Sequence, residues 1–171
     1  MVSMLKAREI MDIILAITID YGQRAKEKEI ACSRNLCREL GINHKVVKLE
    51  FMQEIESGLN ASSPLNDTSP WVPNRNGLFI NLAACYAEHL QADYILCGFN
   101  REEAQDFPDN SAAFIVAVNQ SLYYSTLNHV KVESFVKDLD KVEIIKEAIK
   151  MGLDFNKTWS CYRNTEYPCG Q

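Results

Sequence analysis

The sequence lacks long hydrophobic runs: no stretch approaches the roughly 18 consecutive apolar residues that suggest a membrane-spanning helix. Its first residues also lack the charged, apolar and small-residue pattern of a signal peptide. An excess of basic residues is missing as well, because 18 Lys and Arg stand against 23 Asp and Glu. The net charge of −5 argues against a general binder of nucleic acids or anionic membranes, although it is compatible with a local basic pocket. We therefore expect a cytoplasmic protein with no direct nucleic-acid or membrane partner.

Histidine is scarce, and its distribution predicts no metal site. The three histidines are dispersed along the chain: His44, His89 and His129. Cysteine is more frequent, and six cysteines in a cytoplasmic protein are expected to be reduced thiols or metal ligands, not disulfides. Four of them lie in apolar or helical stretches, where we expect small, buried hydrophobic side chains. These four are Cys32, Cys37, Cys85 and Cys97.

The remaining two cysteines, Cys161 and Cys169, lie in the stretch TWSCYRNTEYPCGQ that ends the sequence, with seven residues between them. A tetrahedral zinc shell needs four ligands and usually takes two of them from a close pair of cysteines. Two thiolates alone therefore cannot complete such a site. The spacing is compatible with half of a zinc site, and thiols packed in a small core are the alternative.

Strand-like and helix-like patterns alternate along the 171 residues, which are enough for one domain with its own core. Short β-branched or apolar runs predict strands at 12–20, 44–50, 93–100 and 129–134. Helical spacing of apolar residues predicts helices at 24–40, 51–59, 77–92, 111–124 and 141–152. Strands separated by crossover helices predict a doubly wound, parallel α/β sheet of about five strands, with 12–20 and 93–100 in its centre.

Polar stretches follow or precede these elements at four places. They are DYGQR (20–24), VPNRN (72–76), GFNREEAQDFPDN (98–110) and KDLDKVE (137–143). The second of them ends a long, proline-rich loop at 60–76, and such loops are often functional. Ligands of open α/β sheets bind at the carboxyl ends of the strands, so these stretches are candidate site segments. Taken singly, each is equally compatible with a turn, a helix cap or a loop anchor.

Taken together and in this order, these stretches resemble the 7-cyano-7-deazaguanine synthase family of N-type ATP pyrophosphatases. The resemblance rests on DYGQR, on VPNRN with the apolar helix that leads to AEHLQADYILCGFN, and on FPDN, KVEII and TWSCY…CG. It covers nearly the whole chain. The family usually has V-P-G-R-N and Y-P-D-C-R, so Asn74 and the PDNS stretch (108–111) depart from its common pattern.

Two segments of the family pattern are missing from the sequence. The family opens with a strand and a phosphate loop, S-G-G-x-D-S, and nothing of that kind lies between Val2 and Asp20. We interpret 1–5 as the first strand and 6–13 as the tail of the first helix, which places the missing loop near Leu5 and Lys6. At the other end the family continues as C-G-x-C-x-x-C, whereas this sequence ends at Gln171. We expect both segments to be omitted from the sequence; a truncated, inactive paralogue is the alternative.

The resemblance implies synthesis of 7-cyano-7-deazaguanine from 7-carboxy-7-deazaguanine, ammonia and ATP in the queuosine and archaeosine pathways. ATP would adenylylate the ring carboxylate, ammonia would form the amide, and a second activation would yield the nitrile. Among candidate catalytic residues, Lys141 would lie on the phosphates, and Arg75 would hold a phosphate or the substrate carboxylate. A solvated helix lysine and a loop-fixing ion pair are the respective alternatives.

The remaining candidate residues belong to the two small-molecule pockets. Asp20 and Gln23 would border the adenosine, and Gly98 would allow the backbone to approach a ligand, unless it is a simple turn glycine. Asp109 would accept hydrogen bonds from the amino and ring N–H groups of the base, or instead cap the helix from residue 111. Asn76 and Asn100 complete the predicted substrate site.

The resemblance also implies metals and a domain plan. An acidic run, Glu102, Glu103 and Asp106, is either a Mg²⁺ site or a solvated loop. Cys161 and Cys169 would be ligands of a structural Zn²⁺. We expect an ATP pyrophosphatase-like domain at 1–157, the start of a zinc-binding segment at 158–171, and a homodimer. Another N-type ATP pyrophosphatase, such as a tRNA thiolase or an amide-forming synthetase, and a non-catalytic regulator are the alternative functions.

Overall fold

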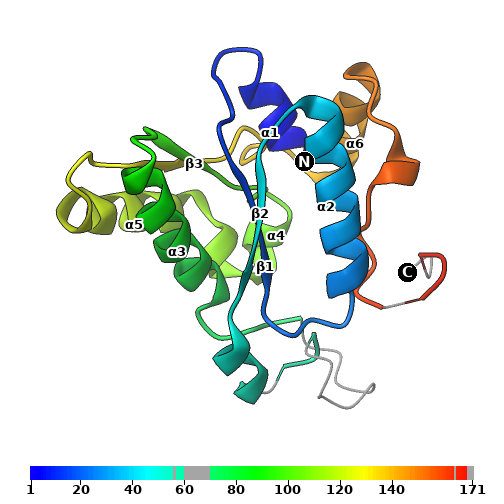
Figure 1. Ribbon diagram of the computed structural model, residues 1–171, viewed down its shortest axis with the longest axis horizontal. Coiled ribbons are helices and arrows are strands. Elements are labelled where there is room, and N and C mark those ends of the chain that lie inside the picture. The colour runs from blue at the N-terminus through cyan, green and yellow to red at the C-terminus, as the bar shows by residue number, and fades with distance from the viewer. Residues whose placement is uncertain (56, 60–69, 164, 169–171) are drawn as a thin grey trace. The chain divides into compact units, whose positions relative to one another are not determined.

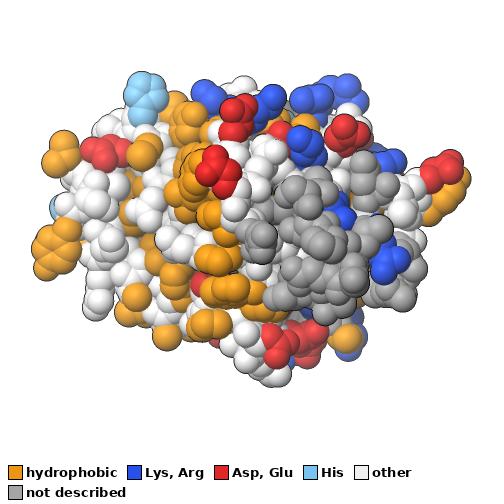
Figure 2. Space-filling model, turned by 90° about the horizontal axis from the view of Figure 1, so that it is seen from below, with side chains coloured by type: hydrophobic (Ala, Val, Ile, Leu, Met, Phe, Trp, Pro, Cys, Tyr) orange, Lys and Arg blue, Asp and Glu red, His pale blue; other side chains and the backbone are white. Residues whose placement is uncertain are grey.

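The computed structural model describes residues 1–55, 57–59, 70–163 and 165–168. The chain forms two compact units, each built from parallel strands and helices (Figure 1). Unit 1 consists of Met1–Ile13 and Asn74–Leu153. Unit 2 consists of Ile14–Pro73 and Asp154–Gln171. On the face drawn in Figure 2, acidic side chains are interspersed with basic ones.

Unit 2 is a β-α-β crossover with a C-terminal segment. Strand β1 (Ala16–Asp20) pairs in parallel with β2 (His44–Lys48), in the register Ala16↔His44 to Asp20↔Lys48. Helix α2 (Lys26–Leu40) connects them and ends at Gly41, whose φ of 68° is left-handed and therefore suits glycine. Two short 3₁₀ helices, η1 (Glu50–Glu54) and η3 (Phe155–Lys157), complete the unit.

Unit 1 repeats this arrangement. Strand β3 (Tyr94–Leu96) pairs in parallel with β4 (Lys131–Glu133), and helix α5 (Ala112–Ser125) is the crossover. The other elements are α1 (Val2–Ala7), α3 (Arg75–His89), α4 (Glu103–Asp106), η2 (Pro108–Asn110) and α6 (Lys141–Lys150). The core of the unit joins α3, β3, α5 and β4 through Ile80, Ala84, Phe99, Ile115, Leu122 and Val132. The parallel strands and their crossovers confirm an α/β fold.

The beginning of the chain contradicts the sequence prediction. The predicted strand at 1–5 is wrong, because α1 is a helix that runs through Leu5 and Lys6. Its apolar residues pack against α6 in a cluster that includes Val2 and Ala148, and packing of this kind stabilises a short helix. The phosphate loop therefore cannot be placed at Leu5 and Lys6.

Other predictions are corrected in extent. The predicted strand at 12–20 begins only at Ala16, and the predicted helix at 51–59 is the shorter η1. Across the described ranges, four strands form two separate pairs, so the five-stranded sheet stays a prediction. Cys37 is buried as expected, but Cys85 is exposed on α3, and that prediction was wrong. No helix among the described residues has the length and hydrophobicity needed to cross a membrane.

Candidate functional site

The two strands of unit 1 end in segments that are bonded to each other. The segment at 97–111 leaves β3, and the segment at 134–140 leaves β4. The hydroxyl of Ser134 donates to the carbonyl of Phe99 at 2.7 Å, and the N–H of Arg101 donates to the carbonyl of Leu139 at 3.0 Å. These bonds form one surface at the carboxyl ends of two parallel strands, which is where α/β sheets bind ligands.

Three predicted residues meet where helix α3 begins. Arg75 and Asn76 are its first residues, and the side-chain amide of Asn76 donates to the carbonyl of Asp109 at 3.4 Å. Burial raises the pKa of the Asp109 carboxyl above its ordinary range, and the nearby Arg75 guanidinium opposes that rise. Asp109 does not cap α5, because Ser111 does so: its hydroxyl accepts from the N–H of Phe114 at 3.1 Å. The carboxylate of Asp109 is thus available for another role.

The residue that starts this helix explains a departure in the sequence. Asn74 has a left-handed backbone, with φ of 53°, a conformation that glycine adopts freely and that asparagine tolerates better than most residues. Its side chain folds over Gly77, where an added Cβ would overlap it. Asn74 can therefore replace the family's glycine without changing the path of the chain into Arg75 and Asn76.

Gly98 and Asn100 follow β3 in the same segment. A Cβ added at Gly98 would meet no described atom within 4 Å, so the described packing gives no steric reason for glycine there. Asn100 is buried, and its side-chain oxygen accepts from the N–H of Glu103 at 3.0 Å. Its first role is therefore to begin α4.

Lys141 opens α6, as the sequence predicted. Its ammonium lies 3.5 Å from Glu103 and 3.9 Å from Glu102, and its backbone N–H donates to Glu102 at 3.1 Å. Asp140 caps the helix and forms a reciprocal capping box with Glu143. The contacts of Lys141 occupy two of the three carboxylates that were predicted as a magnesium site. Nowhere in the described part of the chain do three or more His, Cys, Asp or Glu residues form a group that could hold a metal.

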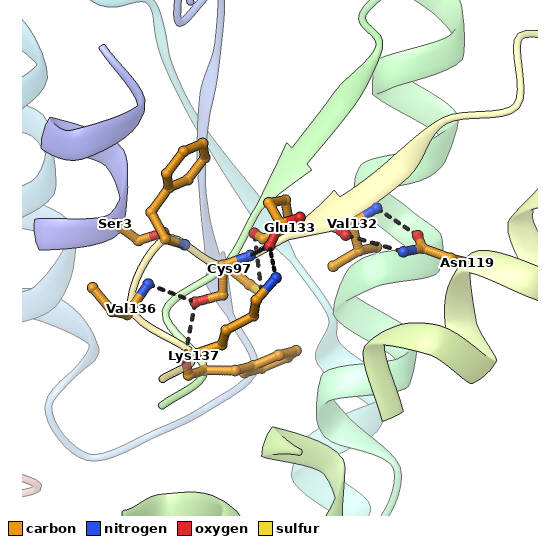
Figure 3. A network of polar contacts seen from close by, with 10 residues as sticks. Ser3, Cys97, Asn119, Val132, Glu133, Val136 and Lys137 are labelled. Carbon is orange, nitrogen blue, oxygen red and sulfur yellow. Dashed lines mark hydrogen bonds and ion pairs between the residues drawn. The ribbon is translucent and has the colours of Figure 1, made fainter. Parts of the chain in front are cut away.

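Figure 3 shows a polar network around β3 and β4 that the sequence analysis did not identify. The ammonium of Lys137 donates to Glu133 at 2.8 Å, and this bond raises the pKa of Lys137. The thiol of Cys97 donates to the carbonyl of Glu133 at 3.5 Å, and burial raises its pKa to about 11, so it is neutral at pH 7. A glutamate at the end of a strand with a lysine four residues later was the available signal.

In unit 2, Asp20 and Gln23 are buried and form the turn that follows β1. Asp20 accepts from the N–H of Gly22 at 3.1 Å and lies 3.5 Å from the ammonium of Lys26. Gln23 accepts from the N–H of Tyr21 at 3.0 Å, and its amide donates to the carbonyl of Ile19 at 3.0 Å and to Glu29 at 2.9 Å. Both side chains therefore shape this turn.

The same unit contains the first of the two predicted zinc ligands. Cys161 is buried, and its sulfur accepts a hydrogen bond from the N–H of Arg163 at 3.4 Å. The indole N–H of Trp159 donates to the carbonyl of Cys161 at 2.7 Å. Cys169 lies outside the described residues, so its predicted distance from Cys161 stays a prediction.

Comparisons with known proteins agree on one family. A family model described as "Queuosine biosynthesis protein QueC" matches residues 1–171. The 7-cyano-7-deazaguanine synthase of Desulforudis audaxviator is 45% identical, over 94% of this chain and 80% of its own length. That of Methanosarcina barkeri is 41% identical, over 96% of this chain and 80% of its own. That of Carboxydothermus hydrogenoformans is 44% identical, over 92% of this chain and 81% of its own.

A solved structure gives independent support for the fold. The U34-tRNA thiolase NcsA from Methanococcus maripaludis, determined with its [4Fe-4S] cluster, matches with a TM-score of 0.57 and 16% identity. The match covers 95% of this chain and 55% of the thiolase, so the chain spans about half the length of that protein. At this identity the likeness supports a shared α/β fold.

Proposed function

The chain belongs to the queuosine biosynthesis protein QueC family, and we propose that it uses ATP to make 7-cyano-7-deazaguanine from 7-carboxy-7-deazaguanine and ammonia. The observation that carries the proposal for this chain's own residues is the meeting of Arg75, Asn76 and Asp109 at the start of α3. A cation and a carboxylate beside an amide suit a substrate that is a guanine-like base with an anionic substituent.

The reaction needs activation because a ring carboxylate is a poor electrophile. A carboxylate oxygen attacks the α-phosphorus of ATP, and pyrophosphate leaves. Ammonia then attacks the acyl carbon of the mixed anhydride and displaces AMP, which gives the amide. A second activation of the amide oxygen makes it a leaving group, and loss of two protons from nitrogen yields the nitrile. The protein's part is to place the reactants and to neutralise charge.

Asp109 is the residue that we assign to recognition of the base. An ionised carboxylate has only acceptor oxygens, and the amino and ring N–H groups of a guanine-like edge are both donors. Arg75, on the neighbouring α3, would hold the substituent carboxylate or a phosphate through its planar fork. Asn76 would support Asp109 from the same helix turn, and Asn100 and Gly98 would border the base from the segment after β3.

Lys141 is our candidate for the phosphates of ATP. Its ammonium contacts Glu102 and Glu103 in exposed ion pairs, which are weak, so a phosphate could displace these partners at small cost. Asp20 and Gln23 would contribute to the adenosine site through the turn that they build in unit 2. Any Mg²⁺ would then be expected to arrive on the ATP phosphates.

We propose a structural Zn²⁺ for the C-terminal segment. Cys161 fits one position of such a site, because a sulfur that accepts a backbone N–H is favourably arranged for the thiolate form. Cys169 and the family's further cysteines would supply the other positions. Zinc would supply cross-linking of the segment, since an all-thiolate shell leaves no position open for catalysis.

The wider plan of the molecule is also a proposal. We propose that β1–β2 and β3–β4 belong to one doubly wound sheet of about five strands, within an ATP pyrophosphatase-like domain at 1–157. The zinc-binding segment would begin at 158. A homodimer in the cytoplasm, without direct nucleic-acid contact, is the assembly that we expect.

The test is nitrile formation by the full-length protein, followed by mass spectrometry with 7-carboxy-7-deazaguanine, ammonia and ATP. Asp109→Asn should lower kcat/KM about a hundredfold or more, because an amide group presents a donor to one of the two N–H groups of the base. Asp106→Asn, the same change in α4, is the matched control and should keep full activity. Activity of Asp109→Asn equal to that of the control would refute the assigned role of Asp109.

Outcomes with the unsubstituted protein separate the alternatives. ATP-dependent conversion of the 7-carboxy base to the amide and the nitrile is the expected result. Sulfur transfer to tRNA without nitrile formation would identify a thiolase instead. Binding of the base without any turnover of ATP would identify a regulator. Either of the last two results would overturn the proposed reaction.

A further inference from the structure

The C-terminal segment of unit 2 lies along one face of helix α2. The ammonium of Lys157 lies 2.9 Å from Glu39, near the end of α2, and Lys28, near its beginning, lies 5.4 Å from the ring centre of Trp159. Positions 28 and 39 differ by about three helical turns, so they share a face of the helix. We call Lys28, Glu39, Lys157 and Trp159 the α2 dock; the segment is the orange-to-red chain beside α2 in Figure 1.

The order of these contacts gives the direction of the segment. Since Lys157 meets the end of α2 and Trp159 meets its beginning, the segment runs antiparallel to the helix. The next residues, including Cys161, therefore lie toward the amino end of α2. This is the end that follows the turn built by Asp20 and Gln23.

Trp159 connects the dock to the thiol. Its ring faces the ammonium of Lys28, and its indole N–H donates to the carbonyl of Cys161 at 2.7 Å. The backbone of the cysteine is thereby fixed relative to α2. The N–H of Arg163 then donates to the sulfur at 3.4 Å and fixes the direction of the side chain. Three successive contacts thus run from a helix to a single sulfur atom.

We infer that Trp159, held by Lys28, is a positioning residue that presents the sulfur of Cys161 to the metal before the metal binds. This inference rests on the proposed zinc role of Cys161. A ligand that is already in place loses less conformational entropy on binding, so pre-positioning raises affinity. Metal binding to a segment without such a dock must also order that segment, which lowers the net affinity.

A purely structural role for these contacts predicts something different. Lys157 and Glu39 are exposed, and an exposed ion pair contributes little to stability. A cation–π contact at a partly exposed site is also modest. Loss of the dock should therefore leave the fold intact and change zinc affinity, whereas a packing role would lower thermal stability and leave zinc affinity unchanged.

The first experiment measures the zinc affinity of the full-length protein by competition with a chromophoric chelator. Trp159→Phe keeps the ring but removes the indole N–H, and loss of one hydrogen bond should weaken zinc binding about fivefold. Lys28→Met should weaken it about two- to fivefold, and Lys28→Arg should restore it, because arginine also binds an aromatic face. Lys146→Met, the same change on α6, is the control and should bind zinc like the unsubstituted protein.

The second experiment asks whether the dock forms without metal. The sequence has two tryptophans, so Trp71→Phe leaves Trp159 as the only fluorophore. In metal-free protein, Trp159 should already be shielded from acrylamide, and Lys28→Met in the same background should expose it. Equal quenching of Trp159 in the native and urea-unfolded protein would overturn the inference.

The two proposals fail in different ways. If Cys161→Ser retains the full zinc content, Cys161 is not a ligand and the zinc proposal fails together with the inference. If Cys161→Ser loses zinc while Trp159→Phe binds it as tightly as the unsubstituted protein, the zinc proposal holds and the positioning role of Trp159 is refuted.

Discussion

At the scale of single residues, Asp109 shows how function and stability oppose each other. Burial raises its pKa above the ordinary value of 3.8, so the folded protein binds this proton more tightly than the unfolded chain. The stability that this group contributes is therefore present at low pH and is lost as pH rises through the raised pKa. At neutral pH the folded protein carries an ionised carboxylate that its surroundings disfavour.

This predicts the stability of Asp109→Asn, the variant expected to be inactive. At pH 7 its unfolding free energy should equal or exceed that of the unsubstituted protein, because the amide has no charge to desolvate. The difference should shrink as pH falls below about 4, where the wild-type carboxyl is protonated in both states. Urea unfolding at several pH values measures it. A variant that is clearly less stable at pH 7 would mean that attraction to Arg75 outweighs burial.

A second prediction at the residue scale concerns Asn74. Its left-handed φ of 53° costs a residue with an ordinary side chain roughly 1–2 kcal/mol, whereas glycine adopts it freely. Asn74→Ala should therefore lower the free energy of unfolding by about 1 kcal/mol and also lower activity, because Arg75 and Asn76 follow directly. Asn74→Gly should keep both. Denaturation curves of the three proteins decide the matter, and equal stability of the Ala and Gly variants would contradict the backbone explanation.

At the scale of elements, the sequence predicts helices better than their partners. The apolar spacing and the closing Gly41 located α2 within two residues of its start, and Ser111 and Asp140 marked the starts of α5 and α6. Residues 1–5 were misassigned because a short apolar run fits a strand and a buried helix equally well. Its helical state depends on packing against α6, which the local sequence does not show.

Strand β4 gives a prediction at this scale, because a side chain takes the place of a neighbouring strand. Asn119 of α5 donates to the carbonyl of Val132 at 3.1 Å and accepts from its N–H at 2.7 Å (Figure 3). Val132 is almost fully buried, so Asn119→Ala leaves two buried backbone groups unpaired and should cost about 2–4 kcal/mol. Gln120→Ala, on the exposed side of the same helix, should cost little. Chemical denaturation compares them, and equal losses would show that Asn119 is dispensable.

At the scale of the whole molecule, the strand-end rule located part of the candidate site and missed the rest. It selected Arg75 and Asp109, 34 positions apart in the sequence, and the fold brings them together at the start of α3. It could not find that Glu102 and Glu103 pair with Lys141, since this depends on how the segments after β3 and β4 meet. The acidic run therefore resembled a metal site in sequence although two of its carboxylates contact a lysine.

The last prediction concerns the division into two units. If Zn²⁺ binds Cys161, its removal from the full-length protein with a chelator should lower the thermal midpoint, because metal binding adds to the free energy of folding. The structural effect should be local: contacts with Glu39 and Lys28 join the C-terminal segment to α2 of unit 2. Hydrogen exchange should therefore accelerate at 154–163 and in α2, and stay unchanged in α3 and α5, whose core lies in unit 1. Equal acceleration in both units would show that the metal stabilises the chain as a whole, and no acceleration would remove the zinc site.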